Sequence, residues 1–306
     1  MTKRLALFIL LLLAAPASAQ QVVLTPYPTD GTYDVQTSIL MDMTITIEPE
    51  ELTAETMEAA AQEQKVSNEM KRYSTLNVVS QDGGHMIRFV DDRIVVNVAS
   101  PMSPTPMTFD SDSPEGANPQ LAAAAVTVGV PMEVMVKGDE TTFINRDESL
   151  DTLVGNVPDG ETRELQRSLI ESTTANAQLL LLNNVGGLLP AGSVSVGDTW
   201  EVVVPSTMSG ADADMVGTMT VTAIDGDLVT FGGPLTMSGD MTMNGLTARI
   251  SGDGTTQMTF DRMTGTSTST TEMNLRATAA MPAEAGMDGD IMIQMGMTTS
   301  ETRTLR

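Results

Sequence analysis

Residues 33–48 read "YDVQTSILMDMTITIE" and alternate between apolar and polar side chains at every position except Thr37 and Leu40. The apolar set is Tyr33, Val35, Ile39, Met41, Met43, Ile45 and Ile47, and the polar set is Asp34, Gln36, Ser38, Asp42, Thr44, Thr46 and Glu48. A period of two predicts a β-strand with one buried face. The run is unusually long for one strand, so we expect it to be bent or bulged.

The same alternation recurs through most of the chain. In "EMNLRATAAM" (272–281), Met273, Leu275, Ala277, Ala279 and Met281 fall on one side. Turn dipeptides separate such runs at Asp82-Gly83, Asp225-Gly226, Asp253-Gly254 and Asp288-Gly289. These residues tolerate the positive φ of tight hairpins, so the chain is predicted to be mainly antiparallel β.

Two stretches depart from this pattern and predict helices. Residues 49–71 are rich in Ala, Glu and Gln, which favours a surface helix. Residues 158–187 carry Leu165, Leu169, Thr173, Ala177 and Leu181 at a spacing of four, with Gly186-Gly187 as the end signal. The second helix separates the β material into two parts.

The two β parts resemble each other. "TLNVVSQDGGHMIRFV" (75–90) aligns with "TMTVTAIDGDLVTFGG" (218–233), and "MTFD" occurs at both 107–110 and 258–261. The sequence therefore predicts two related antiparallel β units, each a sandwich or a half-open barrel, joined by a packed amphipathic helix. The boundaries are a signal peptide at 1–19, a first β unit at 20–157 with a helical insertion at about 49–71, a helical connector at 158–187, and a second β unit at 188–306.

The only tryptophan, Trp200, occurs in "LLPAGSVSVGDTWEVVVP" (188–205). It takes the place that Tyr33 takes in the first unit, at the start of a strand in which Trp200, Val202 and Val204 alternate inward. We interpret it as a packing anchor; a platform for stacking a ligand is the alternative.

Four short motifs resemble a family of exported bacterial proteins of unknown function. They are "LLPAGSVSVGDTWEV" (188–202), "FDS" (109–111), "DRMTG" (261–265) and "GTYDV" (31–35). The resemblance implies a β-rich fold over nearly the whole mature chain. Many members are lipid-anchored, whereas this chain has no cysteine for such an anchor. The family carries no established activity, so it implies no functional residues.

The N-terminus "MTKRLALFILLLLAAPASAQ" is typical of a secretory signal peptide. Lys3 and Arg4 precede an apolar core, and Ala17-Ser18-Ala19 predicts cleavage after Ala19. A membrane anchor is the alternative. We expect an exported protein, periplasmic or extracellular, without stable membrane insertion.

Composition excludes several classes of function. The formal net charge is −24, which repels nucleic acid and anionic surfaces. There is no cysteine and only one histidine, His85, which we expect to face solvent in a hairpin. Thiol and Ser-His-Asp catalysis and the usual zinc sites therefore lack their residues, so no catalytic or cofactor-binding residue is predicted. "DSDSPEG" (110–116) resembles a calcium loop only weakly, because Pro114 and Glu115 occupy positions for a ligand and the turn glycine.

Methionine is unusually frequent, at 24 residues. One reading is a copper(I) site, with candidate thioether ligands Met237, Met241, Met243, Met292, Met295 and Met297. The other reading is a core filler, because most of these residues share parity with neighbouring Leu and Ile. We favour the core filler and expect no cofactor.

Three functions remain open for this chain. The favoured one is non-catalytic binding of an apolar small molecule or lipid by a methionine-rich interior. The first alternative is a structural or interaction module of the cell envelope without a pocket. The second alternative is copper(I) handling. The sequence identifies no protein partner.

Overall fold

The computed structural model describes residues 20–49, 64–101, 105–113, 121, 126–137, 140–156, 188–205, 211–243, 246–280 and 289–306. The strands are β1 (Val22–Val23), β2 (Gly31–Pro49), β3 (Gln64–Gln81), β4 (Gly84–Ala99), β5 (Met107–Asp110), β6 (Met132–Lys137), β7 (Glu140–Phe143), β8 (Ser193–Val194), β9 (Thr199–Pro205), β10 (Ala211–Asp225), β11 (Leu228–Met243), β12 (Leu246–Asp261), β13 (Ser267–Ala280) and β14 (Gly289–Leu305). The helix α3 covers Arg146–Asn156. Within these ranges, no helix has the length and apolar character needed to cross a membrane.

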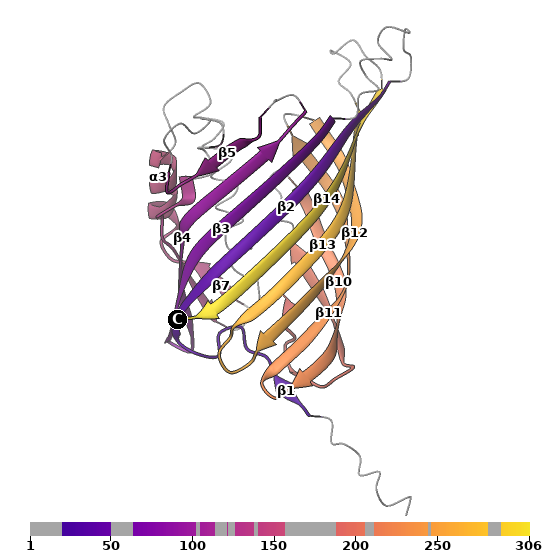
Figure 1. Cartoon of the computed structure of the whole chain (residues 1–306). Coiled ribbons are helices and arrows are strands. Elements are labelled where there is room, and N and C mark those ends of the chain that lie inside the picture. Colours follow the sequence, from indigo (N-terminus) through magenta and orange to yellow (C-terminus); the bar gives the residue numbers. More distant parts are fainter. Residues whose placement is uncertain are drawn as a thin grey trace, which may run out of the picture.

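One antiparallel sheet holds every strand except β1 and β8. Its order is β7-β6-β4-β3-β2-β14-β13-β12-β11-β10-β9, with β5 paired to β4. Figure 1 shows the sheet curling into a trough, and in the described residues no ladder joins the edge strands β7 and β9. The mainly antiparallel β class is confirmed. Strands of both predicted units share this sheet, because β14 pairs with β2 from Gly289 opposite Pro49 to Leu305 opposite Tyr33.

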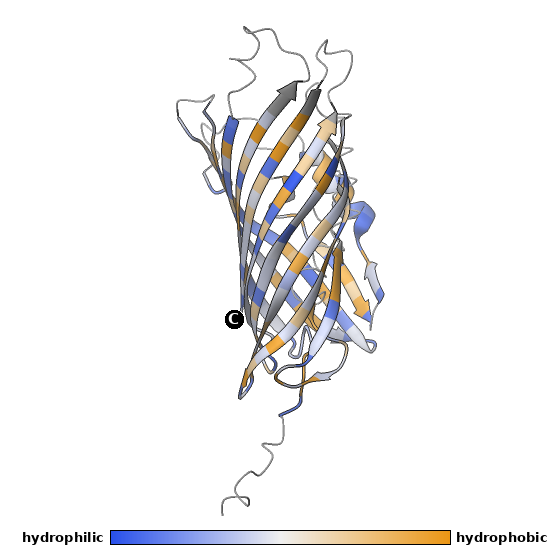
Figure 2. Ribbon diagram, turned by 90° about the vertical axis from the view of Figure 1, so that its right-hand side faces the viewer, coloured by the Kyte–Doolittle hydropathy of each residue, from blue (hydrophilic) through white to orange (hydrophobic). Residues whose placement is uncertain are grey.

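The predicted alternation decides which side chains enter the trough. In β2, Tyr33 and Val35 are buried, and in β13, Met273, Leu275 and Ala277 are buried. Along the strands in Figure 2, hydrophobic and hydrophilic residues alternate, as expected when successive side chains point to opposite faces. The inner face of the trough is therefore the apolar face.

The Asp253-Gly254 dipeptide was expected to form a turn, and this expectation is wrong. Both residues lie inside β12, where Gly254 pairs with Met273 of β13 and Leu235 of β11. A Cβ atom at Gly254 would collide with the Glu272 carbonyl and the Met273 side chain. The glycine thus allows close approach of backbone on the inner face of a tightly curled sheet. The predicted hairpins at Asp82-Gly83 and Asp225-Gly226 are confirmed, with Gly83 and Gly226 at φ values of 78° and 61°.

The helix predicted at 49–71 is wrong over residues 64–71. These residues begin β3, which pairs with β2 from Gln64 opposite Ile45 onward. Alternation of Val66 and Met70 with polar residues outweighs the helical propensity of the segment once a partner strand is present. Residues 50–63 and the helix predicted at 158–187 lie outside the described residues.

The structure contains a short helix, α3, that the sequence analysis did not predict. It begins after Asn145, whose side-chain oxygen accepts the Glu133 amide at 2.8 Å, and Asp147 and Glu148 lie in its first turn. Leu153 is buried in a small cluster with Val126 and Val130. An acidic first turn after Asn is a helix start signal that was overlooked.

The two "MTFD" segments do not occupy equivalent register positions. Phe109 pairs with Val96, far from the β3–β4 hairpin, whereas Phe260 pairs with Val229 beside the β10–β11 hairpin. The strand order β2-β3-β4-β5 nevertheless parallels β9-β10-β11-β12. The identical "MTFD" sequences therefore give no support to a residue-by-residue duplication of one β unit.

Candidate functional site

The inner face of β2, β3 and β14 carries an apolar wall of half-buried side chains. We define the apolar wall by Ile39, Met41, Met43, Ile45, Val66, Met70, Ile291 and Met297. The ladder places Met41 opposite Met297 and Ile39 opposite Met70. These residues are only partly covered, in contrast to the fully buried residues that share their face on β12 and β13. An incompletely covered apolar surface inside a trough is a candidate ligand surface.

Methionine residues from three neighbouring strands meet on this wall. Met41 of β2 pairs with Met297 of β14, which in turn pairs with Met273 of β13. Met43 pairs with Met295 in the adjacent row. Met273 and Met295 are buried, while the other three lie against the same core. The polarizable, unbranched side chains make this an adaptable surface.

The structure brings together only part of the predicted copper set. Met295 and Met297 lie on the inner face, while Met292 has the opposite parity and its sulfur lies 3.1 Å from an Arg276 nitrogen. Met237 is buried on β11, which β12 and β13 separate from β14. Met241 and Met243 lie in β11, where their backbones pair with Ala248 and Leu246 of β12. Sequence analysis did not predict that Met41, Met43 and Met273 would join Met295 and Met297, because strand order was not known.

The segment that contains β1 lies at the lower end of the trough in Figure 1. Val22 pairs with Val194 in a two-stranded sheet, and Val22, Leu24 and Tyr27 are buried. The Arg303 guanidinium fixes this segment, since it donates to the Pro26 carbonyl at 2.8 Å and the Gly265 carbonyl at 2.7 Å. The segment and the β12–β13 turn are therefore tied to one buried cation.

Arg303 is enclosed by aromatic rings. Its guanidinium carbon lies 5.2 Å from the Tyr27 ring centroid, 5.3 Å from that of Tyr33 and 5.9 Å from that of Phe260. Burial lowers the pKa of Arg303. Burial also raises the pKa of Tyr27 and Tyr33, although the charge of Arg303 acts in the opposite direction. Arg remains charged in this setting, so the aromatic faces and carbonyl oxygens replace its hydration.

Glu301 is buried two residues before Arg303 on the same face of β14. Burial raises the pKa of Glu301 to about 7, although Arg303 and a hydrogen bond from Thr37 act in the opposite direction. A carboxyl group near neutral pKa inside an acidic protein is a feature that periodicity alone does not reveal.

Glu301 belongs to a polar belt that crosses the inner face diagonally to the ladder, from the Arg303 row on β3 and β4 to the Ile39 row on β13 and β14. We define the polar belt by Thr37, Arg72, Ser74, Asp91, Ser269, Thr271, Thr299 and Glu301. The buried Asp91 carboxylate accepts hydrogen bonds from the Ser74 and Thr127 hydroxyls, each at 2.8 Å. Arg72 Nε lies 3.4 Å from Asp91 Oδ1, within ion-pair distance. We call the rings of Tyr27, Tyr33 and Phe260 around Arg303 the aromatic floor. The aromatic floor, the polar belt and the apolar wall therefore follow one another along the trough.

Trp200 is a packing residue in the structure. Its Nε1 donates to the Leu188 carbonyl at 3.0 Å, and its ring centroid lies 5.3 Å from that of Phe231. It packs against the core that includes Val202 and Val204, as the sequence predicts. A shallow groove of about 490 Å³ runs beside it along residues 190–194 and 197–200.

His85 was predicted to face solvent, and this prediction is wrong. It lies in β4 opposite Ser80 and Val136, is half-buried, and its ring centroid is 6.0 Å from that of Tyr27. The strand continues to the hairpin, so the histidine falls on the inner parity of β4. In the described part of the chain, no group of three or more His, Cys, Asp or Glu side chains could hold a metal ion.

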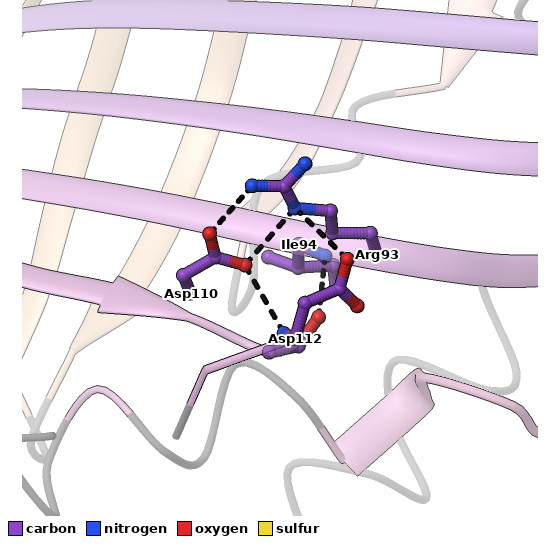
Figure 3. A network of polar contacts seen from close by, with 5 residues as sticks. Arg93, Ile94, Asp110 and Asp112 are labelled. Carbon is purple, nitrogen blue, oxygen red and sulfur yellow. Dashed lines mark hydrogen bonds and ion pairs between the residues drawn. The ribbon is translucent and has the colours of Figure 1, made fainter. Parts of the chain in front are cut away.

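The acidic stretch at 110–112 pairs with arginine. The Arg93 guanidinium contacts the Asp110 carboxylate through Nε, at 3.0 Å, and through Nη2, as Figure 3 shows. Asp110 Oδ1 also accepts the Asp112 amide at 3.1 Å, and the Asp112 carboxylate lies 3.4 Å from Arg93 Nε. Arg93 lowers the pKa of Asp110. The carboxylates of Asp110 and Asp112 are thus engaged by a resident cation.

Comparison with known proteins gives one sequence family. The model of a family of unknown function, DUF6263, matches residues 89–278, from within β4 to within β13. This match confirms the resemblance to an uncharacterised family and names no catalytic activity. No curated protein is similar in sequence at a significant level.

Solved structures give only weak similarities. The β-domain of the Bordetella autotransporter BrkA is 8% identical, with 89% of this chain and 99% of that chain covered and a TM-score of 0.20. An outer membrane channel from Pseudomonas putida F1 is 9% identical, with 90% and 96% covered and a TM-score of 0.20. A Pseudomonas aeruginosa FadL homologue is 9% identical, with 90% and 92% covered and a TM-score of 0.20. Similarity at this level establishes neither fold nor function.

Proposed function

The chain belongs to the family of unknown function DUF6263, and we propose that it is an exported, non-catalytic protein that binds an apolar small molecule or a lipid chain in its trough. The observation that carries this proposal is the apolar wall, which stays half-buried while the inner face of β12 and β13 is packed. A methionine-rich, incompletely covered surface suits ligands of variable shape.

Binding can be tested with the neutral fluorescent probe 1-N-phenylnaphthylamine. We expect saturable binding, and an Ile39→Asp variant should bind at least about tenfold more weakly because a carboxylate in an apolar site must be desolvated. Leu40→Asp is the matched control, since Leu40 neighbours Ile39 but is 42% exposed on the outer face. Circular dichroism would verify that both variants are folded. Equal binding by both variants would contradict the trough as the binding surface.

Copper(I) handling is a second candidate, supported by the row of Met41, Met297 and Met273. In the same samples, mass spectrometry after mild peroxide treatment would locate oxidised methionines. Protection of the partly buried Met41 and Met297 by fatty acid supports the lipid proposal, while the buried Met273 should resist oxidation in every sample. Protection by copper(I) alone supports a metal site, because thioethers select soft ions. Resistance before any addition, together with no probe binding, supports a structural module.

Export rests on the N-terminal sequence. A positively charged start, an apolar core and Ala17-Ser18-Ala19 support cleavage after Ala19. When the full-length chain is produced in a bacterium, the protein recovered from the periplasm or medium should have an intact mass that begins at Gln20. A recovered mass that includes Met1 to Ala19 would contradict export by this route.

A further inference from the structure

The polar belt contains one cation, Arg72, with a buried donor atom that has no hydrogen-bond partner. Arg72 Nε is buried and has no hydrogen-bond partner, because its contact with Asp91 satisfies ion-pair distance without hydrogen-bond alignment. Asp91 depends little on Arg72, since Ser74 and Thr127 already donate to it. The buried polar donor on Arg72 therefore lacks the partner that such groups normally have.

A second unpartnered atom lies four residues away along β3. Asn68 Oδ1 is buried without a hydrogen-bond partner, and Asn68 has the same inner parity on β3 as Arg72. Met70 lies between them, and their ladder partners on β2 are Met41 for Asn68 and Thr37 for Arg72. The free donor of Arg72 thus borders the apolar wall on its polar side, whereas the free acceptor of Asn68 lies within the wall, between Met70 and Val66.

The other cation near this level has its donors engaged. Arg303 donates to the Pro26 and Gly265 carbonyls and interacts with Tyr27, so it serves the floor of the trough. Arg72 is 27% exposed at its side chain, whereas Arg303 is 2% exposed as a residue. Of the two, only Arg72 is accessible to a molecule lying on the apolar wall.

We infer that the trough holds a single-chain amphiphile with an anionic oxygen head group, carboxylate or phosphate, whose head contacts Arg72 while its chain lies along the apolar wall. This inference rests on the proposed function. The arginine guanidinium is the side-chain group best suited to pair with a carboxylate or phosphate. Its attraction to such an anion is strong in a partly desolvated site. The net charge of −24 disfavours docking to anionic membranes, so we assign a single bound molecule as the occupant.

The inference is tested with full-length mature protein and three probes of equal chain length: palmitate, hexadecyl phosphate and hexadecanol. We expect at least one anionic probe to bind more tightly than hexadecanol in displacement of 1-N-phenylnaphthylamine. Arg72→Met should reduce that affinity about tenfold and leave hexadecanol unchanged, as expected for loss of one charge-assisted contact. Arg72→Lys should retain part of the preference. The preferred anionic probe distinguishes a carboxylate from a phosphate head.

Arg249→Met is the matched control, because it removes the same charge from an exposed position of β12. Equal binding of all three probes, or unchanged anion affinity in a folded Arg72→Met variant, would overturn the head-group assignment and leave the apolar trough intact. Failure of every probe, including hexadecanol and 1-N-phenylnaphthylamine, would overturn the proposed function itself.

Discussion

Replacement of Arg303 by methionine is expected to lower the free energy of unfolding by about 3–5 kcal/mol, because it leaves a buried partner charge and two carbonyls without their cation. The carbonyls belong to Pro26 and Gly265, and the nearby carboxyl group is Glu301. Urea denaturation followed by Trp200 fluorescence would measure the loss at pH 7.5. Limited proteolysis should also become faster near Tyr27, since the segment loses its attachment.

Two variants make this result interpretable. Arg306→Met removes an exposed cation paired with Asp34 and should change stability little. Arg303→Lys keeps the charge but not the planar guanidinium, so it should lie between wild type and Arg303→Met. An Arg303→Met protein as stable as wild type would show that the floor of the trough does not depend on this residue.

The fold was predictable where alternation was the deciding signal. The inward faces of β2 and β13 and the hairpins at Asp82-Gly83 and Asp225-Gly226 follow from local sequence. Gly254 was misassigned because the same Asp-Gly pair serves a turn or a close approach between strands, and only the partner strands decide. Residues 64–71 were misassigned because pairing with β2, a tertiary effect, overrides local propensity.

The candidate site was less predictable than the fold. The pairing of β14 with β2 joins residues from opposite ends of the chain, such as Met41 with Met297. Sequence spacing therefore could not show that Met41 and Met43 would join Met295 and Met297. Glu301 and Arg72 likewise look like ordinary strand residues until the curl of the sheet encloses one face of their strands.

Glu301→Gln is expected to flatten the pH dependence of stability. The folded pKa of Glu301 is about 7, against an ordinary value of 4.5, so between these values the folded protein binds more protons than the unfolded chain. Stability from this group is present in full below about pH 4.5 and falls as the pH rises towards 7. The loss is up to about 3 kcal/mol across that window, at about 1.4 kcal/mol per pH unit. Glu301→Gln should lack this slope.

The difference between variant and wild type isolates Glu301 from other acidic groups. Asp34, Asp110 and Glu69 have lowered pKa values owing to partner cations, so their contribution is lost as the pH falls below the window, the opposite sign. Denaturation midpoints measured from pH 4.5 to 8 would give the slopes, with the exposed Glu272→Gln as the matched control on β13. Parallel curves for wild type and Glu301→Gln would mean that Glu301 stays ionised throughout. In that case Arg303 would hold it as a carboxylate, and the two would form a permanent ion pair between the polar belt and the floor of the trough.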